Sequence, residues 1–186
     1  MKAGQCERQD PNYVRNGTQC LIANFEVATG KIISSTVGDT RTEEDFAAHI
    51  ERTIDTDPDG EFVFVVDNLN THCSESLVNL IASRCNITDN LGIKGQSGVL
   101  KNMKTRANFL KEKTHRIRFV FTPKHASWLN QVECWFSILV KRLLKRLSTS
   151  SVSELKQKIF DFIIFFNATM AKPFKWTYSG KVLSKI

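Results

Sequence analysis

Five consecutive apolar residues, Phe62 to Val66 (FVFVV), constrain the fold of this chain more than any other segment. They follow a turn-forming run at residues 57–60 (DPDG) and stop at Asp67. Apolar residues without alternation are typical of a strand that is covered on both faces of its sheet. Such a strand needs helices above and below it, so the segment predicts a layered α/β domain.

The segments around this strand predict further strands and helices. Two β-prone runs, residues 19–29 and 31–37, meet at Gly30 and predict a hairpin. Another strand is predicted over residues 117–121. Helices are predicted over residues 43–55 behind a Thr42 cap, 74–84, about 128–146, and 152 to about 167 behind a capping box of Ser151 and Glu154. This order predicts a mixed sheet flanked by helices on both faces.

The length of the chain, 186 residues, suits one substantial core and is too short for two ordinary domains. We therefore expect a single domain over residues 1–186. Residues 86–115 are polar, contain glycine and are rich in lysine, with weak helical character over 99–110. We interpret them as an insertion on the surface of this domain.

The net charge of +7 is distributed unevenly along the chain. Met1 to Asn90 holds 7 Lys and Arg against 15 Asp and Glu, a balance of −8, whereas the remainder holds 19 against 4, a balance of +15. A basic half on an otherwise acidic chain is expected of a protein that lays one face on a polyanion, with nucleic acid as the first candidate. The alternative is a solvated surface that happens to be uneven.

The five cysteines are scattered and include no C-x-x-C pair, so they indicate reduced thiols and neither a disulfide framework nor a zinc site. No apolar run has the length of a membrane span, and the amino terminus lacks the apolar centre of a secretory signal. We therefore expect a cytoplasmic protein.

Asp67 is the first candidate for chemistry, because it directly follows the buried strand. In sheets of this kind, ligands gather at the carboxyl ends of the strands. A carboxylate held there by the sheet would suit a hard cation such as Mg²⁺. The alternative is an Asp-Asn turn or a cap for the following helix.

Glu133 is the second candidate, on the predicted helix 128–146. It falls at the edge of the apolar stripe of that helix, with Asn130 and Ser137 on the same flank. A carboxylate at this border could point across to the sheet, and the alternative is an ordinary, partly exposed helix residue. The stripe consists of Leu129, Val132, Phe136, Leu139, Leu143 and Leu147.

Other side chains near these segments have two interpretations each. Basic residues at the end of the same helix either face phosphates or stabilise the helix dipole. His72 is a proton carrier, a phosphate contact or a turn residue, and Trp128 and Trp135 pack in the core or stack on bases. The candidate DNA-binding residues are Lys124, His125, Lys141, Arg142, Lys145 and Arg146.

Several strings together resemble the catalytic domain of bacterial insertion-sequence transposases related to the mariner group. They are VVDNLNTH, FTPKHASWLNQVECWFSILVKRLLKR, FFNATMAKPFKWT, RNGTQCLIANFEVATGKI and TRTEEDF. The resemblance implies a DDE endonuclease domain with a ribonuclease-H-like fold. It implies three carboxylates that hold two divalent ions, Mg²⁺ or Mn²⁺, for cleavage and strand transfer of DNA.

By this resemblance, Asp67 matches the second of the three carboxylates and Glu133 the third, both as catalytic metal ligands. The implied partners are transposon ends and target DNA, with a homodimer or association with an intact transposase as further options. The implied location is the nucleoid. A ribonuclease or resolvase of the same fold is a weaker alternative, because its helix is not expected to carry SWLNQVE.

Two features depart from the family pattern. The gap between Asp67 and Glu133 is longer than in compact relatives, by about the length of the insertion at 86–115. The first catalytic Asp is expected on an opening strand that would precede Met1, since Asp10, Glu26 and Asp39 are not in that position. The resemblance thus implies an amino-terminally truncated domain, inactive alone, that also lacks the DNA-reading helix-turn-helix region. The alternative is a non-catalytic remnant that binds DNA or intact transposase.

Overall fold

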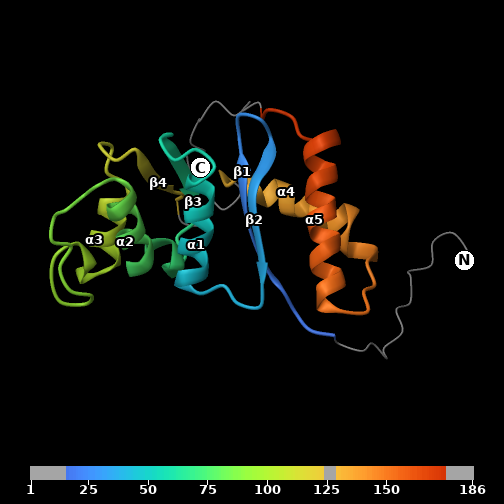
Figure 1. Cartoon of the computed structure of the whole chain (residues 1–186), viewed down its shortest axis with the longest axis horizontal. Coiled ribbons are helices and arrows are strands. Elements are labelled where there is room, and N and C mark those ends of the chain that lie inside the picture. Colours follow the sequence, from blue (N-terminus) through green and yellow to red (C-terminus); the bar gives the residue numbers. More distant parts are fainter. Residues whose placement is uncertain (1–15, 124–128, 175–186) are drawn as a thin grey trace, which may run out of the picture.

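The chain forms an α/β domain consistent with a ribonuclease-H-like fold, as expected (Figure 1). The computed structural model describes residues 16–123 and 129–174. Its strands are β1 (Cys20–Glu26), β2 (Lys31–Gly38), β3 (Phe62–Val66) and β4 (Ile117–Phe121). Its α-helices are α1 (Glu43–Ile54), α2 (Glu75–Arg84), α3 (Met103–Leu110), α4 (Val132–Arg142) and α5 (Val152–Thr169). Short 3-10 turns are η1 (Asn70–Cys73), η2 (Val99–Lys101) and η4 (Leu144–Arg146).

The four strands form two separate sheets, whereas the sequence predicted one mixed sheet. β1 and β2 are an antiparallel hairpin, paired from Cys20 with Gly38 to Glu26 with Lys31. β3 and β4 are parallel, paired from Phe62 with Ile117 to Val66 with Phe121. The two sheets are not hydrogen-bonded to each other, because none of the described strands lies between β1 and β3.

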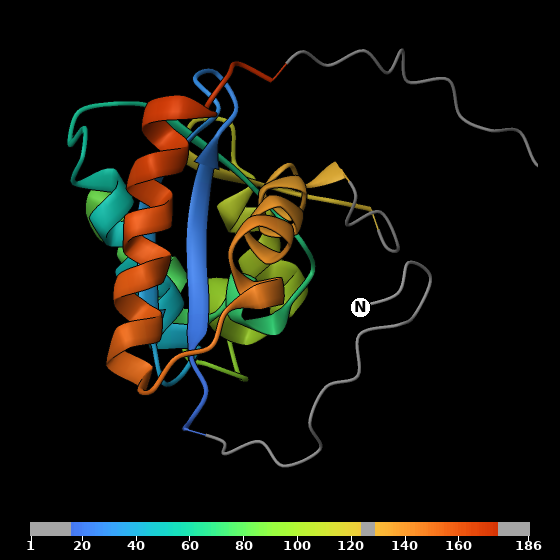
Figure 2. The same ribbon diagram turned by 90° about the vertical axis from the view of Figure 1, so that its right-hand side faces the viewer.

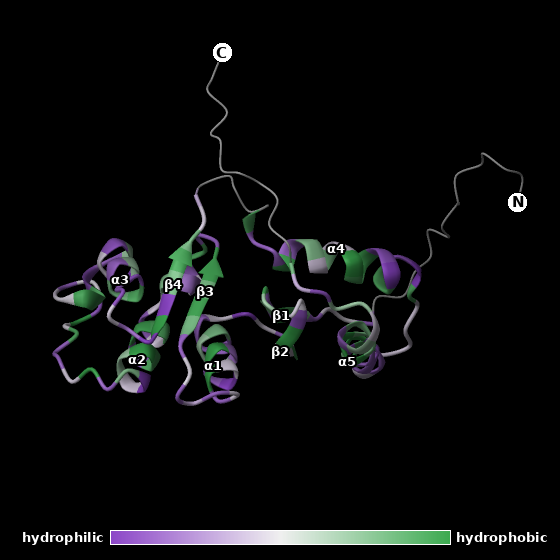
Figure 3. Ribbon diagram, turned by 90° about the horizontal axis from the view of Figure 1, so that it is seen from above, coloured by the Kyte–Doolittle hydropathy of each residue, from purple (hydrophilic) through white to green (hydrophobic). Residues whose placement is uncertain are grey.

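One core lies between the parallel sheet and helices α1, α2 and α3. Phe64 and Phe119 stack across the two strands with ring centroids 5.1 Å apart. The opposite face is open in the described part of the chain: Val63 is 50% exposed and Val65 is 46% exposed (Figure 3). The expectation that β3 is covered on both faces was therefore wrong for these residues. All five side chains are apolar, but only one face of the sheet meets the helices.

A second core joins the hairpin to α4 and α5, and Figure 2 shows α5 lying along the hairpin. Trp135 and Leu139 of α4 are almost fully buried there, packed with Ile32 and Phe166 among others. The prediction that Trp135 packs in the core is confirmed. Trp128 lies outside the described residues.

Helix α1 connects the two cores. Its apolar residues belong to the first core. Its buried polar residues face the hairpin: Thr36 Oγ1 lies 2.8 Å from His49 Nδ1, and Asn24 Nδ2 donates to Thr53 Oγ1 at 2.6 Å. The contact between α1 and the hairpin therefore depends partly on buried hydrogen bonds.

Three of the four predicted helix starts agree with the structure, whereas the helix predicted over about 128–146 is shorter: α4 begins at Val132 and ends at Arg142. Thr42 caps α1 in a reciprocal box with Asp45, and Ser74 caps α2. Ser151 accepts from the Glu154 N–H at 3.1 Å, as expected for α5. The Glu154 carboxylate accepts from the backbone N–H and hydroxyl of Ser150 instead of completing a box with Ser151. These bonds lower the pKa of the Glu154 carboxyl.

The segment 86–115 is more than a surface excursion. Its first part is a loop at the edge of the molecule, but η2 and α3 insert Leu100 and Leu110 into the first core. Arg106 Nε donates to the Cys73 carbonyl at 2.6 Å and fastens α3 to η1. The weak helical pattern over 99–110 was a correct indication.

Four of the cysteines, at positions 20, 73, 85 and 134, are free thiols, as predicted. Among the described residues, no helix is long and apolar enough to cross a membrane.

Gly30 closes the hairpin turn, and we expect it to be intolerant of a side chain. Its φ is +73°, and a Cβ there would overlap the backbone of Lys172. Gly30→Ala should lower the free energy of unfolding by about 2 kcal/mol or more, because steric overlap adds to the strain of a left-handed residue. The matched control is Gly95→Ala, where φ is +77° but the space is open. This variant should lose only about 1 kcal/mol from backbone strain. Equal losses in urea unfolding would contradict the packing of Lys172 on the turn.

His49 should make stability depend on pH. Burial, and secondarily the charge of Arg52, lower the pKa of His49 from 6.5 to about 4. The neutral ring is favoured in the folded chain, so this stabilisation is complete above pH 6.5 and is lost as the pH falls towards 4, amounting to about 2 to 3 kcal/mol. We expect His49→Gln, measured by urea unfolding at pH 7 and pH 4.5, to lose less stability between these pH values than the original chain. The same loss in both proteins would show that His49 is not the titrating group.

Candidate active site

A cleft of about 1020 Å³ separates the hairpin from the parallel sheet. It is lined by residues 21–28 from β1 and its turn, residues 61–72 from β3 and its exit, and residues 129–133 at the start of α4. Asp67 and Glu133 both line it. The cleft thus brings together the two carboxylates that the sequence singled out, from segments 66 positions apart.

Asp67 follows β3 directly and is held in one orientation. Its Oδ1 accepts from the Leu69 N–H at 3.1 Å and lies 2.8 Å from His72 Nδ1. The turn expected as the alternative role of Asp67 is therefore present, and the carboxylate still faces the cleft, 37% exposed. Oδ2 has no hydrogen-bond partner within residues 16–123 and 129–174 and is free to bind another group.

Hydrogen bonds between the ends of β3 and β4 fix the backbone around Asp67. The Thr122 N–H donates to the Val66 carbonyl at 2.9 Å, and Asn68 Nδ2 donates to the Thr122 carbonyl at 2.6 Å. Sequence reasoning did not assign a role to Asn68 or Thr122. Asn68 directly follows Asp67, and Thr122 directly follows β4. These positions at the strand ends could have indicated that both residues lie beside the candidate site.

His72 is brought to Asp67 by the η1 turn. Its ring packs on Phe46 of α1 with centroids 4.3 Å apart, and its side chain is only 16% exposed. Packing on one side and the contact with Asp67 on the other make His72 a positioning residue for the carboxylate. His125, the other candidate histidine, lies outside the described residues.

Glu133 lies in the first turn of α4 and is exposed. The buried side of α4 is centred on Trp135 and Leu139, so Glu133 points away from it, about 160° around the helix from Trp135 at 100° per residue. The apolar stripe predicted from the sequence lies closer to Glu133 than the observed buried side of α4 does, because the prediction omitted Trp135 from the stripe. Glu133 reaches the cleft because it is at the amino end of α4.

The cleft is acidic overall. One cation, Arg41, lines it together with five carboxylates: Glu26, Asp57, Glu61, Asp67 and Glu133. In the described part of the chain, no three His, Cys, Asp or Glu side chains are close enough to hold a metal ion together. Asp67 and Glu133 are thus two suitable oxygen donors, but the described residues alone do not form the two-ion site implied by the resemblance.

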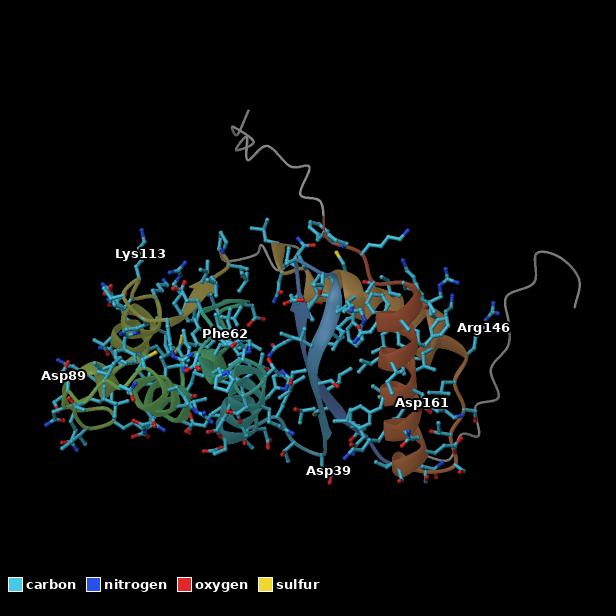
Figure 4. The ribbon with its side chains drawn as sticks, turned by 45° about the horizontal axis from the view of Figure 1, so that its top comes forward. Asp39, Phe62, Asp89, Lys113, Arg146 and Asp161 are labelled. Atoms are coloured by element: carbon cyan, nitrogen blue, oxygen red, sulfur yellow. The ribbon has the colours of Figure 1, made fainter. Side chains whose placement is uncertain are left out.

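The predicted DNA-binding residues lie apart from this cleft. Lys141 and Arg142 end α4, while Lys145 and Arg146 follow in η4; all four are exposed (Figure 4). None of them forms an ion pair within the described residues. Lys124 and His125 lie outside the described residues.

Comparison with known families agrees with this arrangement. Residues 1–156 match the family model described as DDE superfamily endonuclease. No curated protein and no solved structure matches the chain significantly. The family match covers most of the chain, including β3 with Asp67 and α4 with Glu133, and the chain therefore belongs to the DDE superfamily of endonucleases.

Proposed function

We propose that this chain is the catalytic domain of an insertion-sequence transposase that cleaves and joins DNA strands with divalent metal ions. The observation that carries the proposal is that Asp67, at the carboxyl end of β3, and Glu133, at the amino end of α4, line one cleft in a DDE endonuclease. Mg²⁺ or Mn²⁺ are suitable ions for such oxygen donors. Asp67 and Glu133 are the proposed ligands, and His72 orients Asp67.

The third carboxylate of this site is proposed to come from outside the described residues. Asp67 and Glu133 have no third metal-binding side chain near them in residues 16–123 and 129–174. Two carboxylates leave much of the charge of two divalent ions uncompensated. By the family resemblance, we propose that the missing carboxylate is the Asp of a further β-strand that joins the sheet. The described residues alone would then be inactive.

The proposed substrate is DNA, both transposon ends and target. Four cations at the end of α4 and in η4, which form no ion pair with any other described residue, provide a surface for phosphates. This surface also supports the second candidate function, a non-catalytic chain that binds DNA or an intact transposase. Metal-dependent cleavage distinguishes the two.

A longer chain should gain DNA-nicking activity. The longer chain carries a β-prone strand that ends in Asp, fused ahead of Lys2. With Mg²⁺, this longer chain should nick supercoiled plasmid, because a third carboxylate then joins Asp67 and Glu133. The 186-residue chain should not nick.

Two variants of the longer chain make this test specific. Glu133→Gln should lower the nicking rate by more than roughly 100-fold, above the usual effect of outer-shell partners. Asn in place of the added Asp should keep the thermal stability of the fusion and remove activity. Nicking that survives either change would refute the three-carboxylate site, whereas a longer chain that folds but does not nick would favour the binding function.

DNA binding by the 186-residue chain should be weak, independent of sequence and strongly dependent on salt. Removing both Lys145 and Arg146 by alanine substitution should reduce the slope of log K against log salt by up to about 2, since each phosphate contact contributes about 0.9. The matched control removes two exposed residues, Lys104 of α3 and Lys113, which Figure 4 shows on the opposite side of the molecule from Arg146. Fluorescence polarisation with duplex DNA at several salt concentrations measures both slopes. If the two double variants change the slope equally, the end of α4 is not the DNA surface.

A further inference from the structure

The charge of Arg41 has no partner in the described part of the chain. Among the described residues, Arg41 is the only Lys or Arg that lines the cleft, together with five carboxylates. Its side chain is exposed and forms no hydrogen bond or ion pair with any described residue. A guanidinium carries five N–H donors. Those of Arg41 are therefore available to an anionic ligand of the cleft.

The loop that carries Arg41 is held on both sides by one carboxylate. Asp45 Oδ2 accepts from the Thr40 hydroxyl at 2.6 Å and from the Thr42 N–H at 2.8 Å. The Asp45 N–H donates in return to the Thr42 hydroxyl at 3.2 Å. The bonds from Thr40 and Thr42 lower the pKa of the Asp45 carboxyl, so this carboxylate stays ionised and keeps both bonds. Arg41 thus has a preorganised backbone position and a free side chain.

Contacts of α1 place this loop at the end of the cleft that holds Asp67. Phe46, in the first turn of α1, packs on His72 with ring centroids 4.3 Å apart, and His72 Nδ1 lies 2.8 Å from Asp67 Oδ1. Figure 1 shows the chain running from the end of β2 through this loop into α1. Arg41 is five positions before Phe46 and lines the same cleft as Asp67.

Two carboxylates at the start of α1 are engaged elsewhere and do not neutralise Arg41. Asp45 is bonded to Thr40 and Thr42. Glu43 Oε1 accepts from Lys94 Nζ at 3.1 Å, and Lys94 Nζ also lies 3.3 Å from Glu75 Oε2 of α2. The sequence neighbours that could have paired with the guanidinium therefore leave it uncompensated.

A phosphate of a nucleic acid strand is the anion that suits this guanidinium. Arginine can donate two parallel N–H bonds to two oxygens of one phosphate. The carboxylates of the cleft repel such a strand, so a positive charge inside the cleft matters more than one on an open surface. The cations at the end of α4 and in η4 do not line the cleft, so they hold DNA without directing a strand into it.

We propose that Arg41 binds one backbone phosphate of the DNA strand that enters the cleft and thereby positions this strand against Asp67. The inference rests on the proposed function, which makes DNA the ligand of the cleft. Arg41 is a positioning residue, because it orients the strand and transfers no group itself.

Chemical labelling of arginine tests the contact with the 186-residue chain and without any activity. Phenylglyoxal reacts with accessible guanidinium groups, and mass spectrometry of the peptides gives a rate for each arginine. With Mg²⁺, a single-stranded DNA of about 12 nucleotides at about ten times its Kd should slow labelling of Arg41 about tenfold, because about one tenth of the chain stays free. The matched control is Arg52, exposed on α1 but outside the cleft lining, whose labelling rate should not change.

Two further probes identify the contacting group. A peptide nucleic acid of the same base sequence has no phosphates and should leave the labelling of Arg41 unchanged. Inorganic phosphate, at the same concentration of phosphate groups, should also leave it unchanged, because an isolated anion lacks the other contacts of a strand. Protection of Arg41 by either probe as strong as that by DNA would overturn the proposal. Labelling of Arg41 at the full rate in the DNA-bound chain would overturn it as well.

Variants of the longer chain test the role of Arg41 in nicking. Arg41→Gln should lower kcat/KM by about 10- to 100-fold, the usual effect of losing a hydrogen bond to a charged group. The change should lie in KM, because the phosphate contact is made before and during the reaction. Arg41→Lys should recover part of this loss, since it restores the charge without the two parallel N–H donors. Arg52→Gln should keep both constants.

The labelling and the kinetics separate this inference from the proposed function. If the longer chain folds but does not nick, the proposed function fails, and labelling alone decides whether Arg41 binds a phosphate. If the longer chain nicks and Arg41→Gln keeps its KM, the proposed function stands and the positioning role is refuted. Equal losses in Arg41→Gln and Arg41→Lys, with lowered thermal stability in both, would show a structural role for Arg41 instead.

Discussion

Two partly buried hydrogen bonds between α1 and the hairpin hold the halves of this structure in relation to each other. His49 pairs with Thr36 of β2, and Thr53 accepts from Asn24 of β1. Because no strand ladder within the described part of the chain joins the hairpin to β3, these contacts and the adjacent apolar packing of Ile22 set the spacing of the two sheets. Each bond between neutral groups contributes only about 1 kcal/mol. The cleft therefore lies at a junction that is easier to alter than either core.

The candidate active site is divided across this junction. Asp67 is fixed to the parallel sheet by the ladder of β3 and β4, while Glu133 belongs to α4, which packs on the hairpin through Trp135 and Leu139. The distance between the carboxylates thus depends on how the halves meet. A metal ion that binds both halves would favour one arrangement of the halves and of the carboxylates together.

Charge separates the two surfaces to which we assign function. The cleft is lined mainly by carboxylates, which repel the phosphates of DNA, whereas the cations at the end of α4 and in η4 attract them. Bound divalent cations would reverse the sign of the potential at Asp67 and Glu133. Under the proposed function, metal binding would precede close approach of DNA phosphate to the cleft, and the basic surface would hold DNA without metal.

The sequence by itself determined the type and order of most elements of the chain and several of their ends. Thr42 and Ser151 cap helices where expected, and β3 ends just before Asp67, since caps and strand runs depend on neighbours a few positions away. The family resemblance indicated Asp67 and Glu133 as the candidate site residues.

Only the tertiary structure decided that the strands form two sheets, that Val63 and Val65 stay exposed, and that Leu100 and Leu110 enter the core. It also decided that Glu133 faces away from the buried side of α4 while still lining the cleft with Asp67. The physical reason is that strand pairing and burial depend on residues far apart in the chain, and an apolar side chain has the same local pattern whether or not another segment comes to cover it.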